Sequence, residues 1–120
     1  MAHISTTLTE RLRYDPPAVH GAGDEYWGLA WPALEWLEGE LREGMATLET
    51  GSGASTIVFA GAGTEHVAIT PDPDEETRIR RACDALGVPS ERSATAPWSC
   101  ASSRTSFRRS TGRARGSAAA

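Results

Sequence analysis

The sequence predicts an α/β protein: a partial Rossmann-like parallel sheet in the order strand, helix, strand, helix. Two short apolar runs, 45–49 and 66–70, are each followed by a glycine or proline turn and then by a segment with helical periodicity. Strands that alternate with helices pair in parallel, because a crossover must return the chain to the start of the next strand. With 120 residues, the chain is long enough for one domain with one core.

A further helix is predicted ahead of the first strand, over 32–43. Leu34, Leu37 and Leu41 recur at helical spacing, while the charged residues between them point elsewhere. Pro32 suits the first helical position, where its missing N–H would have no partner in any case. We therefore expect an amphipathic helix that packs against the sheet.

The remaining helices are predicted through 57–60, after a cap at 55 or 56, and over about 75–86. In the first, the hydroxyl of Ser55 or Thr56 is expected to cap the helix. The second helix is expected to end at Gly87. Its apolar face comprises Ile79, Ala82, Cys83 and Leu86.

Composition divides the chain into three segments: 1–31, 32–92 and 93–120. The first mixes glycine, proline and aromatic residues without periodicity, so we expect an irregular lead-in. The second carries the α/β pattern. The third contains no Leu, Ile or Val. Because it offers little apolar area to offset a backbone entropy cost of about 1–2 kcal/mol per residue, we expect a disordered Arg-, Ser- and Ala-rich tail.

The charges are distributed as unevenly as the apolar residues. Residues 1–92 carry seven Arg and all sixteen acids, a net charge of −9, whereas 93–120 carry five Arg and no acid. A basic tail can bind nucleic acid. However, all twelve basic residues are Arg, which indicates a GC-rich gene, and such a gene read out of frame gives the same composition. We therefore expect no nucleic-acid partner.

Localisation follows from what the sequence lacks. There is no run of about 20 apolar residues that would span a membrane, and the first residues lack the apolar run of a secretory signal. Cys83 and Cys100 have no metal-ligand spacing around them and form no disulfide framework. We expect a cytoplasmic protein with no membrane partner and no metal site. His3, His20 and His66 are dispersed, and we interpret each as an ordinary solvated or partly buried histidine without an acidic partner.

The segment 48–56, LETGSGAST, is where a ligand is expected. Glycines between a strand and a helix allow a sharp turn and let a ligand approach the backbone. The free N–H groups at the start of the following helix favour electron-rich ligand atoms. Glu49, at the end of the strand, suits a cationic ligand better than a pyrophosphate. These features indicate a cofactor loop.

The same segment resembles the first motif of class I S-adenosylmethionine-dependent methyltransferases, in which an acid precedes Gly-x-Gly at the end of the first strand. A similar likeness is found in the preceding helix, PALEWLEGELREGM, and in the second strand and helix, HVAITPDPDEETRIRRACDALGV. The resemblance implies that S-adenosylmethionine lies across the glycine loop. Its methionine amino group would lie near Glu49, and Gly51, Ser52 and Gly53 would complete the loop contacts.

The resemblance also implies an acid that binds the ribose hydroxyls at the end of the second strand. In this chain the strand ends at Thr70, and the first acid after it is Asp72. We assign the ribose contact to Asp72.

The likeness covers 32–92, roughly half of a complete domain of this family. The strands that would complete the sheet and shape the acceptor pocket should begin after Arg92, where the aliphatic and acidic residues disappear instead. We expect that the reading frame changes near residue 93, which gives a truncated and catalytically incomplete methyltransferase-like protein. The methyl acceptor and the catalytic residues are therefore unknown.

Two alternatives remain open. The first is a dinucleotide-binding Rossmann fragment, with Gly51 and Gly53 as its first two glycines, although the third then falls at Thr56. The second is a non-catalytic fragment or interaction module.

Overall fold

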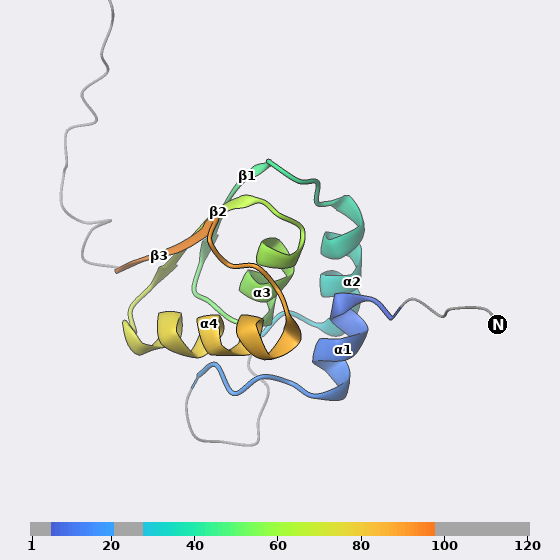
Figure 1. Cartoon of the computed structure of the whole chain (residues 1–120), viewed down its shortest axis with the longest axis horizontal. Helices are drawn as coiled ribbons and strands as arrows, with labels where there is room; N and C mark the ends of the chain where they lie inside the picture. Colours follow the sequence, from blue (N-terminus) through green and yellow to red (C-terminus); the bar gives the residue numbers. More distant parts are fainter. Residues whose placement is uncertain (1–5, 21–27, 98–120) are drawn as a thin grey trace, which may run out of the picture.

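The computed structural model describes residues 6–20 and 28–97, and this part of the chain has an α/β fold (Figure 1). The fold class predicted from the sequence is confirmed. In chain order the elements are α1 (Leu8–Tyr14), α2 (Trp31–Glu40), β1 (Ala46–Thr50), α3 (Ala54–Gly61), β2 (Glu65–Thr70), α4 (Asp74–Leu86) and β3 (Ser93–Pro97).

The strands form one parallel sheet in the order β1-β2-β3. Thr47 on β1 pairs with His66 on β2, and His66 pairs with Ser93 on β3. Because the strands are parallel, their carboxyl ends meet at one edge of the sheet. The loops after β1 and β2 therefore lie side by side, at the edge where ligands bind in open parallel sheets.

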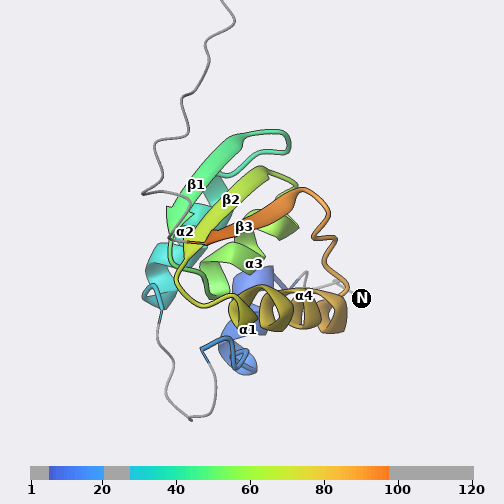
Figure 2. The same ribbon diagram turned by 90° about the vertical axis from the view of Figure 1, so that its left-hand side faces the viewer.

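Helices α3 and α4 cover the same face of the sheet (Figure 2). Helix α3 is central to the core: its Ile57 and Val58 are buried in one cluster with Leu12 of α1 and Leu34 of α2. On the other face, none of the described helices covers the strands, and Leu48 is 65% exposed. The described part of the chain is thus a two-layer unit.

Helix α1 was not predicted, because 1–31 was expected to be irregular. Its N-terminus is a capping box: Glu10 N donates to Thr7 Oγ1 at 3.2 Å, and Thr7 N donates to Glu10 Oε2 at 2.9 Å. The Glu38 carboxylate of α2 accepts hydrogen bonds from the backbone N–H groups of Leu8 and Thr9, at 2.8 and 3.1 Å. With Leu12 buried in the core, α1 is an integral part of the fold.

The boundaries of α2 and α3 differ from the prediction. Helix α2 ends at Glu40, three residues early, because Leu41 is extended (φ −71°, ψ 143°), although its side chain still packs against the core. Helix α3 begins at Ala54, so Ser55 and Thr56 lie in its first turn and do not occupy the N-cap position. Their hydroxyls have another role in the candidate site.

Helix α4 lies close to its predicted range. It ends at Leu86, and Gly87 adopts the left-handed conformation (φ +69°) expected of the stop residue. Ile79 and Cys83 are buried in the core. Burial raises the pKa of the Cys83 thiol to about 11, so this residue is a small buried side chain.

The prediction of disorder from residue 93 onward is wrong at 93–97, which form β3; residues 98–120 lie outside the described part. The strand contains only small residues, threonine and proline, and it forms because its backbone pairs with β2. Two side chains of α4 hold it: Thr95 Oγ1 donates to Glu76 Oε2 at 2.7 Å, and Arg80 Nη2 donates to the Ser93 carbonyl at 3.4 Å. Tertiary contacts thus outweigh weak local propensity.

We expect Glu76→Ala to loosen β3. The substitution removes the acceptor of the Thr95 hydroxyl and the ion-pair partner of Arg80, which together should contribute about 1 kcal/mol to the local stability of the strand. Hydrogen exchange should show faster exchange of β3 amides, while α3 amides change little. Arg81→Ala, at an exposed position on the same helix, is the control. Equal exchange in the two variants would contradict this role of Glu76.

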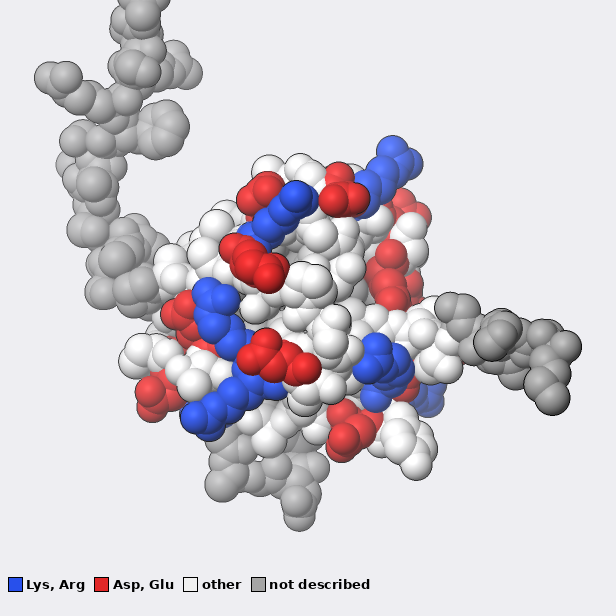
Figure 3. Space-filling view, in the orientation of Figure 1, with Lys and Arg blue, Asp and Glu red and all other residues white. Residues whose placement is uncertain are grey.

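Basic and acidic side chains alternate on the face shown in Figure 3. Arg80 pairs with Glu76 at 2.9 Å, and Arg92 lies 3.7 Å from Glu65 and 3.6 Å from Glu43. Among the residues that the structure describes, this face therefore shows no extended basic patch. None of the described helices combines the length and the apolar character needed to cross a bilayer.

Candidate functional site

The glycine loop connects β1 to α3 at the carboxyl edge of the sheet. Gly51 has a φ of +82°, a backbone conformation that residues other than glycine rarely adopt. Its N–H donates to the Ile69 carbonyl of β2 at 2.6 Å. Gly53 N donates to Thr56 Oγ1 at 3.0 Å, which fixes the start of α3. The loop is therefore held on both sides, by the neighbouring strand and by the helix.

A cavity of about 640 Å³ lies against this loop, within the range of small-molecule sites. It is lined by the end of β1, the loop, the start of α3 and two segments from the N-terminal part of the chain. The described lining residues are His20, Gly28, Leu29, Leu48, Glu49, Thr50, Gly51, Ser52, Gly53, Ala54 and Ser55. The structure thus places Glu49, Gly51, Ser52 and Gly53, the residues predicted to contact a cofactor, at the wall of one cavity.

The Glu49 carboxylate is fixed by its neighbours. It accepts from Ser55 Oγ at 2.6 Å and from Thr56 Oγ1, and His66 Nε2 lies 3.0 Å from Oε1. A carboxylate has about four acceptor positions, so one remains for a ligand. The side chain is 15% exposed and lines the cavity. Ser55 and Thr56, expected as helix caps, instead orient this acid.

His66 is buried beneath Glu49. Its Nδ1 lies 2.8 Å from Thr47 Oγ1, and its ring stacks on Phe59 with centroids 4.1 Å apart. The interpretation of His66 as a histidine without an acidic partner is therefore wrong. Strand alternation could have revealed the pair, because Thr47 and Glu49 share one face of β1 and Thr47 is the register partner of His66.

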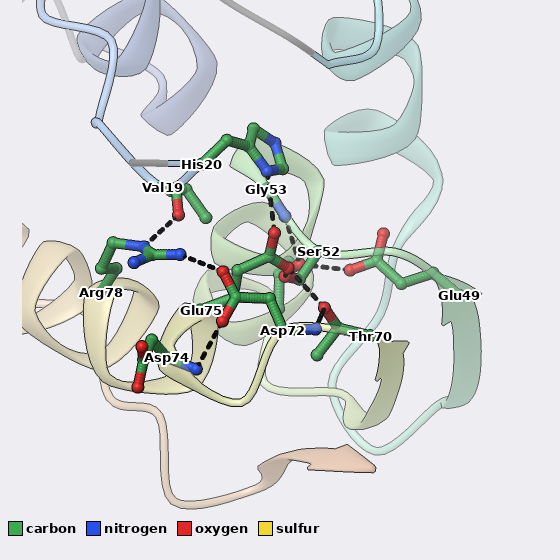
Figure 4. Close-up of polar contacts among 11 residues, drawn as sticks. Val19, His20, Glu49, Ser52, Gly53, Thr70, Asp72, Asp74, Glu75 and Arg78 are labelled. Atoms are coloured by element: carbon green, nitrogen blue, oxygen red, sulfur yellow. Dashed lines mark hydrogen bonds and ion pairs between the residues drawn. The ribbon is translucent and has the colours of Figure 1, made fainter. Parts of the chain in front are cut away.

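Glu75 on α4 forms a second polar cluster beside the loop (Figure 4). Its carboxylate accepts from Ser52 Oγ, from Thr70 Oγ1 at 2.5 Å and from His20 Nδ1 at 3.0 Å. Burial by itself would raise the pKa of Glu75, but the hydrogen bonds from Ser52, Thr70 and His20 outweigh it and lower the pKa. Glu75 is thus a buried, ionised acceptor that connects the loop to α4.

The sequence analysis did not identify Glu75 as a site residue. The interpretation of His20 as a histidine without an acidic partner is also wrong, because His20 bonds to Glu75. Ser52 was predicted to contact the ligand. It lines the cavity, but its hydroxyl proton is donated to Glu75. Its backbone and the lone pairs of its oxygen remain for a ligand.

Asp72, the predicted ribose contact, follows β2 at the same edge of the sheet but does not line the cavity. Its Oδ1 accepts from Asp74 N at 2.9 Å, and its Oδ2 accepts from Arg78 Nη2 at 2.5 Å. The Asp74 N–H and the Arg78 guanidinium lower the pKa of Asp72. The Asp72 carboxylate therefore accepts from the first backbone N–H of α4 and pairs with Arg78, so in this arrangement it is not directed at a ligand across the loop.

No protein-family model matches the chain, and no curated protein sequence matches it significantly.

Proposed function

We propose that this chain is a methyltransferase-like protein that binds S-adenosylmethionine in the cavity beside residues 49–53. The observation that carries the proposal is the Glu49 carboxylate in the cavity wall, next to a glycine loop at the carboxyl edge of a parallel sheet. One acceptor position of the Glu49 carboxylate remains for a hydrogen-bond donor of the ligand. The ammonium group of S-adenosylmethionine is such a donor, and the sulfonium of the same molecule adds a second positive charge.

The charges of the cavity favour this ligand over a dinucleotide. No Arg lines the cavity among the described residues, and the acid Glu49 lies beside the start of α3, where a pyrophosphate would have to bind. A helix N-terminus favours an anion, but a fixed carboxylate at the same point repels one. A dinucleotide-binding fragment is therefore the weaker proposal.

The proposed function is binding of the cofactor, without transfer of its methyl group to an acceptor. Methyl transfer requires a nucleophile held in line with the breaking C–S bond. The loop and Glu49 line one cavity, and Ser52 and His20 connect its wall to Glu75. This arrangement supports a cofactor site, and no acceptor site is assigned. We therefore propose a catalytically incomplete protein.

A second candidate, a non-catalytic interaction module, is favoured by one observation. Leu48 and Val67 are exposed on the sheet face that the described helices leave uncovered. A protein that only bound a partner through this face would show no saturable binding of S-adenosylmethionine, so a titration with this ligand separates the two functions.

Calorimetric titration with S-adenosylmethionine is expected to give saturable one-to-one binding, which Glu49→Gln weakens about tenfold or more by removing a charge-assisted hydrogen bond. Binding of 5′-methylthioadenosine, which lacks the amino acid part, should change much less. Glu43→Gln, at a glutamate whose side chain is 80% exposed and outside the cavity, is the matched control. Unchanged affinity in the folded Glu49→Gln variant would contradict the assignment of Glu49, and a flat wild-type titration would contradict the function.

A further inference from the structure

The segment that follows α1 is fixed against α4 next to the cavity. Val19 is buried in the core, and its carbonyl accepts from Arg78 Nε at 2.5 Å. The next residue, His20, lines the cavity and bonds to Glu75 (Figure 4). Helix α4 therefore holds this segment at two points, the Val19 carbonyl and the His20 imidazole, although His20 lies 55 residues from Glu75 in the sequence.

The bond to Glu75 determines which nitrogen of His20 carries a proton. The lowered pKa of Glu75 means that its carboxylate is ionised at neutral pH and can only accept. Nδ1 of His20 must therefore be the donor. In the neutral imidazole, Nε2 then carries the lone pair.

Nε2 is free to meet a ligand within the described part of the chain. No described residue bonds to it, and the His20 side chain is 36% exposed. The charged groups that face His20 are Glu75 and Arg78 of α4, Asp72 of the preceding loop and Glu49 in the same cavity wall. His20 thus adds to the cavity an acceptor whose availability depends on protonation.

We propose that Nε2 of His20 accepts a hydrogen bond from an O–H or N–H group of the bound adenosyl cofactor, so that cofactor binding is coupled to the protonation state of His20. The inference rests on the proposed function and adds a second recognition point to it. Glu75 is the positioning residue of this pair, because it fixes the tautomer. A protonated Nε2 is a donor and cannot accept, so binding should weaken when the imidazole is protonated.

The test compares S-adenosylhomocysteine affinity at about pH 8 and about pH 5.5 in the wild type and in His20→Asn. The asparagine amide can still donate to Glu75 but has no group in place of Nε2. We expect the wild type to bind about three- to tenfold more tightly at the higher pH. The variant should keep a melting temperature near that of the wild type, bind more weakly at the higher pH by a similar factor, and lose the pH dependence.

A second probe identifies the donor. The compound 5′-methylthioadenosine keeps the ribose hydroxyls and lacks the α-amino group. A pH dependence that persists with this probe assigns the bond to an adenosine hydroxyl or amine, and one that disappears assigns it to the amino acid part of the cofactor. Both results support the coupling to His20.

Two results would overturn the inference while the proposed function stands. One is saturable binding of S-adenosylhomocysteine with equal affinity at both pH values and in His20→Asn. The other is a ¹⁵N NMR spectrum in which Nε2, rather than Nδ1, of neutral His20 is protonated. A flat wild-type titration would overturn the proposed function and, with it, the inference.

Discussion

Replacement of Glu75 with alanine is expected to lower the free energy of unfolding by about 3 kcal/mol. Glu75 is buried and accepts hydrogen bonds from the loop, from the end of β2 and from His20. Each hydrogen bond to a charged group contributes about 1.5–3 kcal/mol, and bonds that share one carboxylate are not additive. Without the acid, the hydroxyls of Ser52 and Thr70 lose a buried partner. The loop, α4 and residues 19–20 should therefore loosen together.

Chemical denaturation measures this effect, and its pH dependence tests the cause. The folded-state pKa of Glu75 lies below the ordinary glutamate value of 4.5. Its contribution to stability is therefore complete above about pH 4.5 and is lost as the pH falls through the folded-state value. The wild type should lose this contribution on acidification, and Glu75→Ala should show a smaller loss.

The matched control for Glu75 is Asp84→Ala, at an exposed acid on the same helix. It should change the free energy of unfolding by no more than about 0.5 kcal/mol. A similar small change in Glu75→Ala, with an unaltered pH profile, would show that the polar cluster contributes little to stability.

Replacement of Leu12 with alanine is expected to cost about 2–5 kcal/mol. Leu12 is fully buried. Through this side chain the short helix α1 packs into the same core as α2 and α3. The smaller side chain removes apolar burial and leaves a cavity at the point where the three helices meet. The expected loss is a large fraction of the stability of a domain of this size.

Urea denaturation of Leu12→Ala and Tyr14→Ala tests the role of α1. Tyr14 lies on the same helix and is 93% exposed, so its variant should unfold at nearly the wild-type midpoint. If both variants had the wild-type midpoint, α1 would not be part of the cooperative unit.

The sequence was informative where the structure is determined locally. Apolar runs bounded by glycine and proline gave β1, α3, β2 and α4 within a few residues, because each is a short segment with its own periodicity. The capping box of Thr7 and Glu10 was also a local signal for α1, and it was overlooked. Strand β3 could not be found in this way, because its small residues become a strand only through pairing with β2.

The candidate site divides in the same manner. Glu49, Gly51, Ser52 and Gly53 belong to one continuous motif, and the structure brings them to one cavity. Glu75 is one of four acids at 72 and 74–76, and nothing local distinguishes it from the others. Its selection depends on the fold, which directs its carboxylate toward two hydroxyls and a histidine distant in the sequence.

The three contacts to the Glu49 carboxylate have a consequence for the thermodynamics of association. A surface glutamate must give up rotamer freedom when it meets a ligand, at a cost of about 0.5–1.5 kcal/mol for an immobilised side chain. Ser55, Thr56 and His66 have already restricted this acid. The entropic penalty at this contact therefore falls on the incoming molecule alone, and a rigid ligand should gain more from it than a flexible one.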